Sequence, residues 1–145
     1  MKKSDIYAAY AVVNKAKLTK LDDAAKIKVI KACKEMRPIA VDLEEFTKEA
    51  ADKLAGERHE EIMKRAEQWK IEGTKTGLSI EERVEINEYM AAWNKRTDEC
   101  LKEEHGKDVE LKFAKLTDEE FMKLMASNDW TAGECAAAES VLLDV

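Results

Sequence analysis

The side chains in this sequence that could carry out chemistry are two histidines, three cysteines and several pairs of adjacent acidic residues. His59 is followed by Glu60 and Glu61, as at the start of a zinc-protease helix, but no second histidine stands four residues further on. His105 lacks the glutamate three residues before it that a di-iron helix needs, because position 102 is a lysine. The spacing therefore predicts no metal site.

The candidate nucleophiles and phosphate loops are incomplete as well. Cys33, Cys100 and Cys135 are far apart and without zinc-ligand spacing, so we interpret them as reduced, intracellular core thiols. No Gly-x-Ser-x-Gly elbow is present, and the Gly73–Gly77 loop lacks the spacing of a P-loop. Adjacent acids such as Glu44–Glu45 point to different faces of a helix and resemble solvated charges. We expect a protein that is not an enzyme and uses no cofactor.

The amino-acid composition indicates the fold class that positions these residues. Charged residues make up 39% of the 145 positions, proline occurs once and glycine five times. Few helix breakers together with many alanine, glutamate and lysine residues predict an all-α or mainly α protein. A hydrophobic content of 45% argues against disorder. The length fits a single helical domain of residues 1–145.

One long helical run, from Leu21 to about Glu72, dominates the pattern. Its apolar residues recur in steps of three and four at Ala25, Val29, Ala32/Cys33, Met36, Ala40, Leu43, Phe46, Ala50 and Leu54. Pro38 predicts a kink, but the stripe keeps its phase across it, so we expect one continuous helix. Gly56 is a second weak point, beyond which the helical pattern continues with a narrower stripe.

Helix start and stop signals divide the rest of the chain. Ser4 predicts the cap of a short first helix, and the segment from Glu72 to Leu78 predicts a loop. Capping boxes at Ser79, Thr117 and Thr131 open a third helix and two small C-terminal helices. The third helix should end near His105–Gly106. Because the loop before it is short, we expect it to return along the long helix as an elongated antiparallel hairpin of the coiled-coil kind.

The segment Lys107–Leu116 alternates apolar and charged residues with a period of two, which is a strand pattern. A single strand is not stable alone, so it needs a mate. The only other alternating piece is Lys17–Leu21. The two segments therefore allow a two-stranded patch beside the helices.

The charge is unevenly distributed. The net charge is −6, but residues 1–40 carry +6 and residues 41–145 carry −12. The simplest interpretation is that the basic segment packs beside acidic segments of the same chain. The alternative is a nucleic-acid accessory protein that uses the basic segment 15–37, with a candidate patch of Lys20, Lys28, Lys31, Lys34 and Arg37. This segment lacks the interleaved aromatic residues that stack on bases, which makes nucleic acid the less favoured partner.

Two of the three tryptophans are candidates for a protein interface. Trp69 lies beyond Gly56, next to the loop that carries Lys75, and Trp130 stands in a turn. An exposed tryptophan is a typical interface anchor, so Trp69, Lys75 and Trp130 form our candidate interface, with tertiary packing as the alternative for both rings. Trp93 lies on the presumed core face. No apolar run is long enough for a membrane span and no signal-peptide core is visible, which predicts a cytoplasmic protein without membrane contact.

The order of these features resembles a family of small uncharacterised phage and prophage proteins. The resemblance rests on the Ala24–Ala32 lysine-rich helix, the long acidic hairpin, the Val109–Leu111 segment and the Leu116–Phe121 turn. It spans most of the chain, and the turn at Trp130 has no counterpart in it. The resemblance implies a viral context and a protein that binds itself, a phage protein or a host protein, in the host cytoplasm or the virion. An oligomer is compatible with this expectation.

Overall fold

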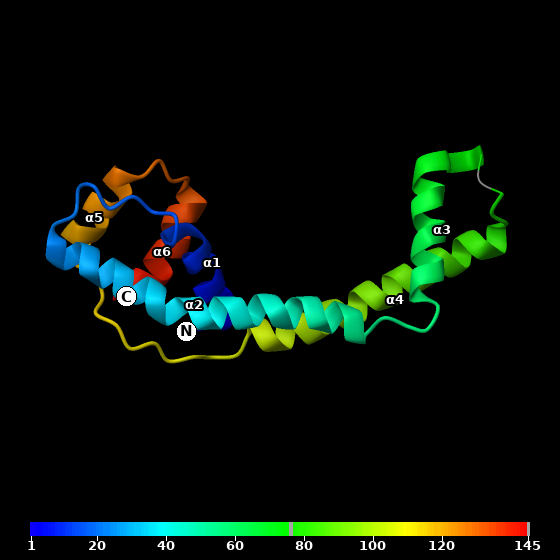
Figure 1. Ribbon diagram of the computed structural model, residues 1–145, viewed down its shortest axis with the longest axis horizontal. Helices are drawn as coiled ribbons and strands as arrows, with labels where there is room; N and C mark the ends of the chain where they lie inside the picture. The colour runs from blue at the N-terminus through cyan, green and yellow to red at the C-terminus, as the bar shows by residue number, and fades with distance from the viewer. Residues whose placement is uncertain (76, 145) are drawn as a thin grey trace. The chain divides into compact units, whose positions relative to one another are not determined.

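The structure is a computed structural model, and it describes residues 1–75 and 77–144. These residues form helices and no strands, as the composition predicted (Figure 1). The helices are α1 (Lys3–Val13), α2 (Asp23–Lys53), α3 (His59–Glu72), the short 3-10 helix η1 (Gly73–Lys75), α4 (Ile80–His105), α5 (Asp118–Ser127) and α6 (Ala132–Leu142).

The chain forms two compact units, which are described separately. The first unit consists of Met1–Phe46 and Glu103–Val145, and the second unit of Thr47–Lys102. The long helices α2 and α4 each contribute to both units. The single domain of residues 1–145 stays a prediction.

The first unit is built around one apolar core. Helix α1 packs against α6, and α5 also contacts α6 (Figure 1). The core consists of Ile6, Ala9, Val13, Leu21, Ala25, Val29, Ala32, Met36, Leu116, Phe121, Leu124, Ala138, Val141 and Leu142. Short side chains let α1 and α6 approach closely, and Met36, Phe121 and Leu124 contribute larger side chains to the same core.

The predicted stripe is buried along the first part of α2, whereas Phe46 is only partly buried and Leu54 lies beyond the end of the helix. Ala25, Val29, Ala32 and Met36 are at most 1% exposed, and the helix continues without a break through Pro38. The Asp22 side chain accepts a hydrogen bond of 2.8 Å from the Ala25 backbone N–H, which satisfies one of the free donors at the start of the helix. The sequence pattern is therefore sufficient to orient this helix.

The prediction that α2 continues to Glu72 is wrong. Helix α2 ends at Lys53, and α3 begins at His59 after a short connection. The Ala51 carbonyl, one of the last four in α2, accepts a hydrogen bond from the Trp93 indole, and the Gly56 N–H donates to the Tyr89 hydroxyl. Side chains of α4 thus take over backbone groups that a continuous helix would pair internally.

The predicted strand pairing between Lys17–Leu21 and Lys107–Leu116 is not formed. The alternation of the second segment is real, because Val109, Leu111 and Phe113 pack against the core of the first unit. However, this segment is extended without a ladder and makes isolated bridges elsewhere, between Lys2 and Asp108 and between Leu116 and Leu143. A hydrophobic period of two indicates that one side of a segment is buried, but it does not indicate that a partner strand is present.

The connector that was expected to be the mate strand is held by side chains instead. Asn128 accepts a hydrogen bond of 2.7 Å from the Lys17 N–H and donates one of 2.9 Å to the Lys17 carbonyl. Ser127 accepts a third bond, of 3.0 Å, from the Lys20 N–H. Because these side chains satisfy the backbone of the connector, it needs no strand partner.

The helix start signals are correct with one exception. Ser79, Thr117 and Thr131 each accept a hydrogen bond from the N–H three residues on, as capping boxes require. Ser4 is not a cap, because α1 begins at Lys3 and its N-cap is Lys2. There the Lys3 N–H donates to the Lys107 carbonyl at 3.0 Å, so a distant backbone group replaces a capping side chain.

The predicted loop from Glu72 to Leu78 is partly confirmed. Helix α3 ends at Glu72, and Gly73 follows with a φ of 58°, the left-handed conformation that favours glycine. The chain then makes the turn η1. Thr76 in the middle of the predicted loop lies outside the described residues.

Candidate protein-binding surfaces

A cluster of three rings joins α3 to α4 in the second unit. His59, the first residue of α3, is hydrogen-bonded through Nδ1 to the Tyr89 hydroxyl at 2.6 Å. Its ring packs edge-on against Trp93, with centroids 4.7 Å apart. The Tyr89 hydroxyl also accepts from Gly56 at 3.1 Å, and Trp93 donates to Ala51 at 3.1 Å. The start of α3 is therefore fixed against the middle of α4.

Ion pairs extend this contact along the two helices. Arg58 pairs with Glu85 of α4 and, at 3.3 Å, with Glu61 of α3. Arg65 lies 2.7 Å from Glu61 and 3.9 Å from Glu82. The hydrogen bond from Arg58 lowers the pKa of Glu61, and the same bond raises the pKa of Arg58. These groups are half exposed, so they contribute little energy and mainly determine which faces meet.

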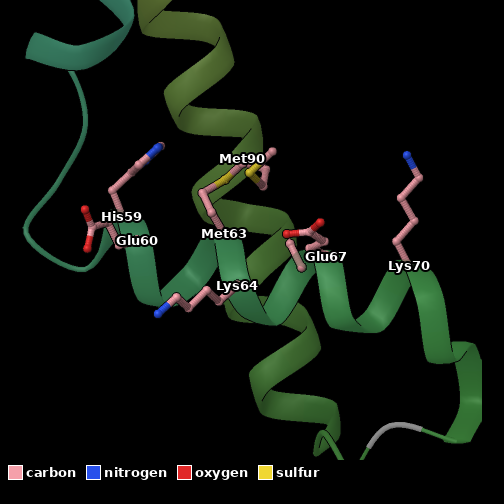
Figure 2. A pocket seen from close by; sticks show the side chains of 8 residues that line it. His59, Glu60, Met63, Lys64, Glu67, Lys70 and Met90 are labelled. Carbon is pink, nitrogen blue, oxygen red and sulfur yellow. The ribbon is translucent and has the colours of Figure 1, made fainter.

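An open pocket of about 830 Å³ lies between α3 and α4. Its lining residues are His59, Glu60, Met63, Lys64, Ala66, Glu67, Lys70 and Met90. Figure 2 shows Met63 of α3 and Met90 of α4 pointing toward one another, with the charged side chains of Glu60, Lys64, Glu67 and Lys70 spread along α3. Thioether side chains are flexible and polarizable, which suits an adaptable apolar contact. We call this surface the methionine pocket.

The far end of α3 carries the predicted interface residues Trp69 and Lys75. Trp69 is partly buried, and the Arg83 guanidinium lies 5.8 Å from its ring centroid. Lys75 is exposed in η1. Exposed apolar side chains occur in the same unit, with Ile71 and Ile80 each 77% exposed. Trp69 and Lys75 therefore share the second unit with exposed apolar side chains, and their role at an interface stays a prediction.

Trp130, the third residue of the predicted interface, belongs to the first unit. It is partly buried and packs against the apolar core. The preceding residues Ser127 and Asn128 hold the connector through Lys17 and Lys20. The turn at Trp130 thus has a structural role in the first unit, because it packs on the core and binds the connector.

The predicted basic residues differ in their surroundings. Lys28 is paired with Glu120 of α5, with a Nζ–Oε1 distance of 2.7 Å, and its hydrogen bond lowers the pKa of Glu120. The other four side chains are exposed, namely Lys20, Lys31, Lys34 and Arg37. Part of the basic segment therefore packs against an acidic side chain of the same chain, as the simpler interpretation expects.

The structure also reveals a groove that the sequence reasoning missed. Two hollows of about 450 and 180 Å³ lie between α1 and α2 in the first unit, and Tyr10 and Asn14 line both of them. The exposed residues Ile30 and Val41 of α2 line one hollow each. We call this surface the α1–α2 groove. A signal was present, because Ile27, Ile30 and Val41 share the helix face opposite the buried stripe.

The side chains that could carry out chemistry are dispersed in the described part of the chain. It contains no group of three or more histidine, cysteine or acidic residues that could hold a metal ion. All three cysteines are free and partly buried. Burial raises the pKa of the Cys33 thiol, which keeps it protonated and weakens it as a nucleophile.

Comparisons with protein-family models, with curated proteins and with solved structures give no match. Among the residues that the structure describes, no helix is both long and apolar enough to cross a membrane.

Proposed function

We propose that this protein acts by binding other proteins and not by catalysis, with the methionine pocket as a contact surface. The observation that carries the proposal is the apolar floor of Met63, Ala66 and Met90 left open between α3 and α4. Side chains of this kind gain free energy when a partner removes them from water, at roughly 25 cal/mol per Å². They offer no group that would take part in a reaction.

The charges around the pocket add specificity. Glu60, Lys64, Glu67 and Lys70 follow one another along α3 with alternating sign. A partner helix with the opposite order of charges would pair with them, whereas a uniformly charged ligand would meet repulsion at two of the four positions. This pattern favours a protein ligand over a nucleic acid for the second unit.

We further propose that the second unit works as an antiparallel helical hairpin. The contacts of α4 support this arrangement, because they run in opposite order along the two arms. Ala51 contacts Trp93, Gly56 contacts Tyr89, and Arg65 pairs with Glu82. Such an arrangement presents α3 and α4 together to a partner.

The biological context of the proposal comes from the resemblance to phage and prophage proteins. In that context the partner is a second copy, a phage protein or a host protein, and the role is virion assembly or inhibition of a host factor. The nucleic-acid alternative draws support from the exposed side chains of Lys20, Lys31, Lys34 and Arg37.

The test is capture of partners on the immobilised protein, together with light scattering of the free protein to detect self-association. Met63→Asp and Met90→Asp place a charge on the pocket floor and should abolish a specific complex. The matched control is Met122→Asp, because Met122 is an exposed methionine of α5 in the first unit. Glu67→Lys with Lys70→Glu changes the charge pattern without touching the floor and should also weaken binding.

Circular dichroism melting curves show whether each variant is folded. A partner retained equally by Met63→Asp, Met90→Asp and Met122→Asp would count against the methionine pocket. A monomeric protein that captures neither a phage nor a host protein would refute protein binding as the function.

A further inference from the structure

The α1–α2 groove differs from the methionine pocket in both its shape and its charge. Its two hollows adjoin each other, because Tyr10 and Asn14 line both, and together they form a trough along α2. The lining residues of α2 extend from Val29 to Glu44. At about 1.5 Å per residue this stretch is roughly 22 Å long, which matches a helical ligand of about 15 residues.

The floor and edges of the groove are apolar surface that a monomer leaves in water. Ile30 is 58% exposed, Tyr7 41% and Val41 40%. Ile27, three residues before Ile30, is 51% exposed and extends the apolar face of α2 toward its start. Single exposed apolar residues are ordinary, but three that line one trough, with Ile27 beside it on the same helix, indicate a binding surface.

The charges on the groove identify the kind of ligand. Three cations line it, Lys15, Lys34 and Arg37, against the single carboxylate of Glu44 at one end. The chain as a whole carries a net charge of −6. A basic trough on an acidic protein attracts an acidic ligand locally, while the rest of the surface repels it in other orientations.

We propose that the α1–α2 groove binds an acidic amphipathic helix of another protein, which places its apolar face on Tyr7, Ile30 and Val41 and its carboxylates beside Lys34 and Arg37. The proposal is independent of the methionine pocket, because it concerns the other unit. It gives the protein two separate binding surfaces, one for each unit.

Nucleic acid fits the groove less well than an acidic helix does. Phosphates bind to lysine and arginine wherever they are exposed, so Lys20 and Lys31 would contribute as much as Lys34 and Arg37. An apolar floor gains nothing from a phosphate backbone. The two ligands therefore predict different effects of Ile30→Asp, which should abolish binding of an amphipathic helix and leave phosphate contacts intact.

The experiment uses the full chain and a fluorescent peptide of about 16 residues, the length that covers the groove. The peptide carries leucines at helical spacing on one face and glutamates beside them. Fluorescence anisotropy should give a Kd of about 1–100 μM that rises with salt. A scrambled peptide of equal composition and a peptide with lysines in place of the glutamates should bind at least about tenfold more weakly.

Matched variants locate the peptide on the groove. Lys34→Glu with Arg37→Glu should raise the Kd at least about tenfold, and so should Ile30→Asp. Lys20→Glu with Lys31→Glu makes the same change in net charge away from the groove lining and should change the Kd by less than about threefold. Because these residues are exposed, the thermal unfolding curves of the variants should stay close to that of the unmodified protein.

Cys33 offers a second readout because it lines the groove. In a Cys100→Ser, Cys135→Ser background, bound peptide should slow alkylation of Cys33 in proportion to its occupancy. The scrambled peptide should give no protection. This measurement separates binding in the groove from binding elsewhere on the chain.

Four results would overturn the proposal. The first is equal binding of the acidic and scrambled peptides. The second is equal loss of affinity in the Lys20/Lys31 and Lys34/Arg37 variants. The third is that the peptide does not bind, whereas a single-stranded oligonucleotide binds at about 50 mM salt and still binds the Ile30→Asp variant. This result would assign the basic segment to nucleic acid. Self-association that is lost in Ile30→Asp would instead identify a second copy as the occupant and would also contradict the proposal.

Discussion

Different interactions stabilise the interior of each of the two units. The first unit contains every large side chain that is essentially fully buried in the described residues, among them Ile6, Met36 and Leu124. In the second unit the buried hydrophobic residues are Ala50, Ile62 and Ile86. Its helices are joined instead by hydrogen-bonded rings and by arginine–glutamate pairs on the surface.

This difference indicates which unit changes its conformation more easily. Apolar burial contributes most of the free energy of folding, whereas exposed ion pairs contribute at most about 1 kcal/mol each. The second unit should therefore open at a lower free-energy cost than the first, as regions that change shape on binding commonly do. The methionine pocket lies in the weaker unit and the α1–α2 groove in the firmer one, so we expect the pocket to adapt to its ligand and the groove to bind with little rearrangement.

The largest expected effect is that of a cavity in the first unit. Leu124→Ala removes a side chain with no solvent exposure and should lower the free energy of unfolding by about 3–4 kcal/mol. Ile62→Ala in the second unit should cost about 2 kcal/mol, because fewer buried atoms surround the change. Urea denaturation measures both values. An equal or larger loss for Ile62→Ala would contradict the comparison of the two units.

A smaller and more local effect is expected for Tyr89→Phe. The change removes the hydroxyl that bonds both Gly56 and His59, and it should cost about 1–2 kcal/mol. Hydrogen exchange should accelerate in the connection between α2 and α3 and at the start of α3. The amides of α1, α5 and α6 serve as the internal control and should exchange as before. Uniform acceleration across both units would show that they unfold together.

The sequence was sufficient for those parts of the fold that local rules determine. The steps of three and four along α2 placed Val29 and Met36 in the core, and capping boxes at Thr117 and Thr131 gave the starts of α5 and α6. These features depend on residues within one or two turns of each other. They can be predicted because the same few residues cause them.

The remaining features depend on distant residues. Helix α2 stops at Lys53 because Trp93 binds the Ala51 carbonyl in its last turn and Tyr89 binds the Gly56 N–H just beyond its end, across 42 and 33 positions of the chain. The alternating pattern around Leu111 correctly indicated a segment with one buried side. The pattern could not show that this side packs against helices and that no strand pairs with the segment. Of the candidate interface residues, Trp69 is partly buried and Lys75 is exposed, and their role at an interface stays a prediction. The α1–α2 groove could not be predicted as a whole, because its lining combines residues of α1 and α2 that only the fold brings together.

The helix caps allow the same chemical change to be made in both units. Thr131→Ala removes the cap of α6, which packs on α1 in the first unit, and should cost about 1 kcal/mol of global stability. Ser79→Ala removes the cap of α4 in the second unit and should mainly increase exchange of the first α4 amides. Thr131→Ser retains the hydroxyl and is the control. A global loss with Ser79→Ala as large as that with Thr131→Ala would show that α4 is coupled to the core.

The smallest effect concerns the pair between Lys28 and Glu120 in the first unit. Its hydrogen bond lowers the pKa of Glu120 below the ordinary value of 4.5. The folded state therefore favours the ionised carboxylate, so the pair stabilises the protein above about that pH and loses its effect as the pH falls through the lowered pKa. Lys28→Met, which keeps the apolar stem, should lower the free energy of unfolding by less than about 1 kcal/mol at neutral pH. Denaturation curves of both proteins should converge in acid and in high salt, since the apolar core beside the pair is unaffected by either. A difference that persists in acid would mean that Lys28 acts through packing, and the charge of Glu120 would then have no part in holding α5 to α2.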